Sequence, residues 1–213
     1  MDVSKRSRDL SPYAGFDRAE TSLTTVIENA SAVTVWDVEA RTGMEVGATV
    51  TLQRAHAAMT LRLWATNPTD SAQPYQYWLN AMLALGGNRI SDATRFVIPA
   101  DQVIVHSTGD DALPDAWARM SWPIYNGRDL SRYDTWTSYL GFFIPQLNAG
   151  FIGVYDGAAD QGIVRTLKPG WPVGNKIFGP GTLPPSLWTD DDSTYVELWS
   201  GATPTFADLY TIE

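Results

Sequence analysis

Apolar and polar residues alternate over long stretches of this chain, first across residues 21–36 and again across residues 45–66. A period of two residues places every second side chain on the same face of a β-strand. The clearest unit is a hairpin in which Glu45–Gln53 and Met59–Thr66 flank a short polar connection that contains His56. The pattern therefore predicts an all-β protein built from antiparallel sheets.

Further segments have the length and the β-branched or aromatic composition of strands. They are residues 75–83, 94–98, 102–106, 138–144, 149–156, 162–166 and 194–200. The best helical candidate, residues 110–120, contains Pro114, which limits it to one short turn. Prolines and glycines are frequent across residues 166–192, which predicts a long ordered loop there.

Length and charge limit the class of protein. The 213 residues include no cysteine, and we expect one domain over residues 21–213 after a polar segment at 1–20. The net charge of −9 argues against nucleic acid and anionic membrane surfaces as partners, and it disfavours anionic sugars except near Arg62, Arg89 or Arg119. No apolar run reaches the ~18 residues of a membrane span, and the first residues lack the apolar core of a signal peptide. The sequence does not indicate in which cellular compartment the protein works.

Cofactor chemistry has no sequence signature here. The chain has no phosphate-binding glycine motif and only two histidines, so we expect no cofactor and no metal site. Asp190, Asp191 and Asp192 are consecutive, and a solvated turn explains them better than a calcium site.

Tryptophan and tyrosine are unusually frequent, with nine of each, so some of these rings are expected to face a ligand. Gln76, Trp78 and Asn80 alternate with apolar residues and would form one row on a sheet face. Sugars stack on aromatic rings and bond to planar polar groups, so this row is a candidate binding surface. Arg62 and Trp64 share a face of the hairpin and are weaker candidates.

Glu197 is the best candidate for chemistry. In a strand, Tyr195, Glu197 and Trp199 share one face, and a carboxylate between aromatic rings suits a general base or an acceptor for sugar hydroxyls. An equally good interpretation is that the Glu197 carboxylate has no chemical role and forms an ion pair with an arginine. His106, at a strand end before Asp110 and Asp111, is a candidate acid or an ordinary hydrogen-bonded residue. A glycosidase would need a second carboxylate, and Asp129, Asp134 and Asp156 remain open.

Several segments, in order along the chain, resemble the DUF5107 family, which is similar to the galactose mutarotase-like superfamily. They are residues 67–69 (NPT), 77–81 (YWLNA), 98–101 (IPAD), 150–156 (GFIGVYD), 174–178 (GNKIF) and 188–198 (WTDDDSTYVEL). The resemblance implies a β-supersandwich, shortened or truncated here, whose concave sheet binds carbohydrate. It also makes Glu197 similar to the general base of aldose 1-epimerases. The acid histidine of those enzymes belongs near residues 75–80, where this chain has none.

We therefore expect a carbohydrate-binding and non-catalytic β-sandwich. Its groove would be lined by Gln76, Trp78, Asn80, His106, Tyr195, Glu197 and Trp199, with Arg62 and Trp64 as weaker contributors. One alternative is a sugar epimerase or glycoside-active enzyme that uses Glu197 as base and His106 as acid. Another is a structural accessory module that contacts other domains of a larger protein or a second copy of the chain.

Overall fold

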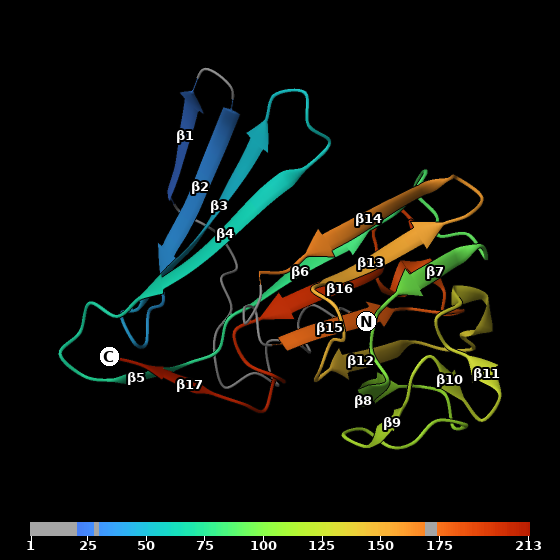
Figure 1. Cartoon of the computed structure of the whole chain (residues 1–213). Coiled ribbons are helices and arrows are strands. Elements are labelled where there is room, and N and C mark those ends of the chain that lie inside the picture. Colours follow the sequence, from blue (N-terminus) through green and yellow to red (C-terminus); the bar gives the residue numbers. More distant parts are fainter. Residues whose placement is uncertain (1–20, 28–29, 169–173) are drawn as a thin grey trace. The chain divides into compact units, whose positions relative to one another are not determined.

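The computed structural model describes residues 21–27, 30–168 and 174–213, and they form two compact units (Figure 1). Of the described residues, those within 76–210 form one unit, and those up to Tyr75 together with Thr211–Glu213 form the other. The expectation of a single domain over residues 21–213 stays a prediction. No helix among the described residues is long and apolar enough to cross a membrane.

The smaller unit contains a four-stranded antiparallel sheet in chain order. Its strands are β1 (Thr21–Ile27), β2 (Ala30–Val38), β3 (Glu45–Gln53) and β4 (Met59–Thr66). The predicted hairpin is confirmed as β3 and β4, which pair antiparallel along their length. Asn67 ends this hairpin by accepting hydrogen bonds from the Thr69 backbone and hydroxyl, as an asparagine in a turn commonly does. A short sheet pairs β5 (Gln73–Tyr75) with β17 (Tyr210–Ile212).

The larger unit contains two main sheets. A six-stranded sheet has the order β6 (Trp78–Leu83), β16 (Val196–Gly201), β15 (Gly174–Gly179), β12 (Leu140–Ile144), β8 (Gln102–Thr108) and β9 (Arg119–Ser121). A three-stranded sheet has the order β14 (Gln161–Thr166), β13 (Phe151–Asp156) and β7 (Thr94–Val97). The larger unit also contains a short hairpin and two 3₁₀ turns. The hairpin pairs β10 (Ile124–Tyr125) with β11 (Arg128–Asp129), and the turns are η1 (Tyr133–Thr135) and η2 (Pro185–Leu187).

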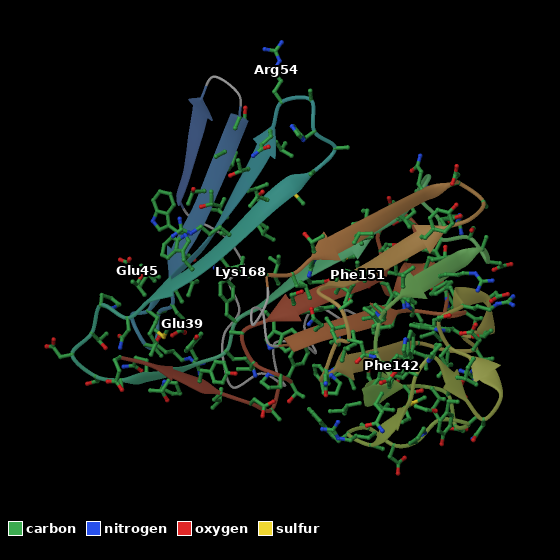
Figure 2. The ribbon with its side chains drawn as sticks, in the orientation of Figure 1. Glu39, Glu45, Arg54, Phe142, Phe151 and Lys168 are labelled. Atoms are coloured by element: carbon green, nitrogen blue, oxygen red, sulfur yellow. The ribbon has the colours of Figure 1, made fainter. Side chains whose placement is uncertain are left out.

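The hydrophobic core lies between these two sheets (Figure 2 labels one of its members, Phe142). It includes Val105, Phe142, Ile177 and Leu198 from the large sheet and Phe96, Ile152 and Val154 from the small one. Trp136 is 2 % exposed, stacks on Phe96 and donates its indole N–H to the Leu130 carbonyl. Burial of each apolar side chain contributes about 1.5–3 kcal/mol to folding, so this core holds one face of the large sheet against the small sheet.

The expectation of a loop across residues 166–192 is wrong in its centre, where β15 forms the third strand of the large sheet. All six residues of β15 are buried, so the strand shows no alternation in polarity. Its terminal glycines are required by close packing. A Cβ on Gly174 would collide with the Thr203 carbonyl and the Trp78 ring, and one on Gly179 with Tyr133. Residues 110–120, which were expected to form at most one short helical turn, contain turns but no helix.

Candidate functional site

The candidate site lies on the face of the six-stranded sheet that points away from the core. On β16, Val196 and Leu198 belong to the core, so Glu197 and Trp199 lie on the opposite face. Trp199 pairs with Lys176 of β15 on one side and with Asn80 of β6 on the other. Three adjacent strands therefore bring Asn80, Trp199 and Lys176 into one row.

Lys176 is a buried cation, with only 3 % of its surface exposed. Its Nζ lies 4.3 Å from the centroid of the Trp199 ring, 5.3 Å from that of Phe178 and 5.5 Å from that of Phe206. Within the described part of the chain, no hydrogen bond or ion pair reaches this ammonium. Burial lowers the pKa of Lys176 to about 8, although the charge of Glu197 acts in the opposite direction.

Glu197 is oriented by its neighbour on the same strand. The carboxylate is buried, and its Oε2 accepts a hydrogen bond from the Trp199 indole N–H at 2.6 Å. Burial raises the pKa of the neighbouring Tyr195, and the charge of Glu197 raises it further. Asn80 has a buried Oδ1 with no hydrogen-bond partner in the structure described. The face thus combines a lysine and an amide oxygen that lack protein partners with a carboxylate fixed by one bond.

An aromatic cluster adjoins these polar groups. Phe206, in the segment of residues 202–208 that follows β16, lies at its centre. Its ring centroid is 4.9 Å from those of Trp78 and Phe143, 5.2 Å from that of His106 and 5.7 Å from that of Trp199. We call residues 202–208 the covering segment, because Phe206 lies over the centre of the predicted sugar-binding surface.

Gln76 and Trp78 were both predicted to bind sugar, but their polar atoms bond to the covering segment. Gln76 Nε2 donates to the carbonyls of Phe206 at 2.7 Å and Asp208 at 3.0 Å. The indole N–H of Trp78 donates to the Thr203 hydroxyl at 3.0 Å. The Trp78 ring also lies against Gly201, where any Cβ would collide with it. In this structure both residues hold the covering segment in place.

Replacing Gln76 by alanine is expected to lower the free energy of unfolding by about 1–3 kcal/mol, because it leaves backbone carbonyls of the covering segment without donors. Chemical denaturation followed by tryptophan fluorescence measures this loss. Gln161→Ala is the matched control, since Gln161 is exposed on β14. Equal losses in the two variants would contradict the assigned role of Gln76.

His106 lies on the same face but farther from Glu197. Its Nδ1 is 3.0 Å from the Ser107 hydroxyl, and its ring packs edge-on against Phe143 and Phe206. Burial, assisted by the charge of Lys176, lowers the pKa of His106 to about 3, so the imidazole is neutral at pH 7. Because β12 and β15 separate β8 from β16, the backbones of His106 and Glu197 are about 14 Å apart.

The remaining candidates lie elsewhere. Arg62 and Trp64 are on β4 in the smaller unit, where the Trp64 ring packs against Gly47. His56 is exposed in the β3–β4 connection. Asp191 accepts a hydrogen bond from the Ser193 backbone in the turn before β16. Over the described ranges, no three His, Asp or Glu side chains form a group that could hold a metal ion.

The sequence did not predict Lys176, Phe206 and Trp117 as residues of this face, nor Phe143 and Phe178, which they contact. The Trp117 ring is 52 % exposed and stacks on Phe143 with centroids 5.7 Å apart and an interplanar angle of 22°. Its backbone φ of 73° lies in the left-handed region. The surplus of tryptophan predicted that some rings face a ligand, but no local pattern singles out this one.

Comparison with known proteins identifies the fold. No protein-family model matches the chain, and no curated protein matches its sequence. A TPR-domain containing protein from Parabacteroides distasonis superposes with a TM-score of 0.74 at 19 % identity, covering 91 % of this chain and 32 % of that one. A candidate aldose 1-epimerase from Klebsiella pneumoniae superposes with a TM-score of 0.55 at 11 % identity, covering 84 % of this chain and 44 % of that one. The chain thus spans less than half the length of each.

These superpositions confirm the predicted fold class: the chain has a galactose mutarotase-like, antiparallel β fold. At this level of identity the likeness concerns the fold alone, since one fold carries many activities.

Proposed function

We propose that the chain binds carbohydrate on the face of its six-stranded sheet that points away from the hydrophobic core. One observation carries the proposal: this face combines an exposed indole, Trp117, with two polar groups that make no hydrogen bond to a described residue, the ammonium of Lys176 and the buried Oδ1 of Asn80. A sugar offers apolar C–H groups for the ring and hydroxyls for the polar atoms. Glu197 Oε2 is already held by Trp199, so its carboxylate is positioned to accept a hydroxyl.

The fold is consistent with this proposal, because it is shared with a candidate aldose 1-epimerase. Membership of the DUF5107 family is part of the same proposal. Four segments that carry that resemblance fall on β6, β13, β15 and β16, of which three contribute to the site face.

Removing the exposed indole is expected to weaken sugar binding at least about tenfold, since stacking on one ring contributes about 0.5–1.5 kcal/mol beyond its area and the ring also buries apolar surface. Trp117→Gly is the suitable variant, because glycine adopts a φ of 73° without strain. Calorimetric titration with a panel of monosaccharides and methyl glycosides measures the loss. The control is Tyr155→Ala, which removes an exposed ring from the three-stranded sheet.

Equal affinity in Trp117→Gly and wild type would contradict the assigned surface. An absence of binding to every sugar tested would instead favour a third function, an accessory module of a larger protein. That alternative is supported by the TPR-domain containing protein, because the region that superposes on this chain makes up only 32 % of that larger protein.

The second candidate function is sugar epimerisation, with Glu197 as general base and His106 as acid. It is favoured by the fixed carboxylate of Glu197 and by the fold. Two observations argue against His106 as the acid that works with Glu197. Its imidazole is neutral at pH 7 and so has no extra proton to donate, and two strands separate it from Glu197. Glu197→Gln keeps the shape of the side chain and removes its basicity, so it is expected to abolish anomer interconversion measured by polarimetry while sugar binding persists. Unchanged turnover in this variant would exclude Glu197 as the base.

A further inference from the structure

The ammonium of Lys176 is a set of hydrogen-bond donors with no acceptor. Lys176 is 3 % exposed, yet the described residues offer its ammonium only the faces of Trp199, Phe178 and Phe206. Aromatic faces attract a cation but do not replace the hydrogen bonds that an ammonium makes in water. A buried polar group without partners is costly to keep.

Glu197 does not fill this role. Its carboxylate influences Lys176 through its charge, but no oxygen of Glu197 lies within 4 Å of Nζ, and Oε2 is bonded to Trp199. Across β15 and β12, the facing partner of Lys176 is Phe143, which brings no acceptor either. No described residue supplies an acceptor for this ammonium, so its acceptor is water or a ligand.

We infer, on the basis of the proposed carbohydrate site, that the ligand is a sugar with an anionic substituent, a carboxylate or a sulfate, and that Lys176 binds that substituent. An anionic oxygen makes a charge-assisted hydrogen bond, which is stronger than one to a neutral hydroxyl. The three surrounding rings lower the local dielectric constant and so strengthen the attraction between the charges.

The neighbouring groups complete the recognition of the sugar ring. Asn80 Oδ1 is a buried acceptor without a donor, and Asn80 pairs with Trp199, which separates it from Lys176 in the row. It suits a ligand hydroxyl, as does the carboxylate of Glu197. The net charge of −9 disfavours anionic sugars in general, whereas the buried cation on this face selects them locally.

The test compares anionic sugars with neutral sugars that differ from them in the substituent at one ring position. Methyl glucuronide and methyl galacturonide are titrated against methyl glucoside and methyl galactoside by calorimetry, with glucose 6-sulfate and galactose 6-sulfate as separate arms. Wild type is expected to bind one anionic sugar about tenfold or more tighter than its neutral partner, the ratio that separates a charged from a neutral hydrogen bond. Which arm shows the preference distinguishes a carboxylate from a sulfate ligand.

Variants assign the preference to Lys176. Lys176→Met is expected to bring the anionic-to-neutral ratio close to one, because anionic sugars lose much more affinity than neutral ones, and Lys176→Arg is expected to retain a preference. Lys168→Met is the matched control, because Lys168 is an exposed lysine of the same unit (Figure 2) and its loss changes the net charge equally. It is expected to keep the wild-type ratio.

The outcomes separate this inference from the proposed function. Equal binding of anionic and neutral sugars by wild type, or a preference that survives in Lys176→Met, would overturn the role of Lys176 and leave carbohydrate binding standing. Failure of every sugar to bind would overturn both.

Discussion

Acidification from pH 6.5 to pH 3 is expected to lower the stability of the fold by up to about 5 kcal/mol through His106 alone. Its pKa in the folded protein is about 3, against 6.5 for an unperturbed histidine, and each unit corresponds to about 1.4 kcal/mol. The unfolded chain takes up this proton as the pH falls below 6.5, whereas the folded protein does so only near 3. The unfolded state therefore binds more protons than the folded state between pH 6.5 and pH 3. As the pH decreases through this window, the free energy of unfolding decreases too.

A variant isolates this effect from the protonation of carboxylates. His106→Phe keeps a ring between Phe143 and Phe206 and cannot titrate. Urea denaturation at a series of pH values is expected to give curves for wild type and variant that diverge progressively below pH 6.5. Curves that stay parallel from pH 8 to pH 3.5 would show that the environment of His106 does not disfavour its charged form.

Strand alternation was sufficient to predict much of the fold. The β3–β4 hairpin is found at the predicted residues because both strands alternate and a polar connection separates them. Glu197 and Trp199 lie on one face, as expected from their spacing within β16. These features depend on local sequence, and a period of two residues determines them directly.

Features set by distant contacts were not predictable in this way. β15 is buried on both faces and contains a lysine and two terminal glycines, a composition typical of loops. Phe206 reaches the site because Gln76, 130 residues earlier in the chain, bonds to its carbonyl. Trp117 is brought to the face by stacking on Phe143. Tertiary packing decided each of these positions, and the site depends on all three.

Replacing Lys176 by methionine is expected to stabilise the protein by up to about 3.5 kcal/mol at pH 7. Burial lowers the pKa of Lys176 from 10.5 to about 8, so the charged form is disfavoured in the fold by about 2.5 units at about 1.4 kcal/mol each. Methionine fills a similar volume without a charge. Urea denaturation of Lys176→Met and wild type measures the gain, and Lys168→Met serves as the exposed control, with little expected change.

The pH dependence identifies the cause of this gain. Between pH 8 and 10.5 the unfolded chain still holds the lysine proton that the folded protein has released, so the stability of wild type is expected to rise with pH across this window. The advantage of Lys176→Met should shrink accordingly and vanish above pH 10.5. An advantage that is constant with pH would reflect packing rather than charge. A buried cation that lowers stability by this amount is typical of groups retained for binding, which is why its loss should stabilise the fold while it removes the preference for anionic sugars.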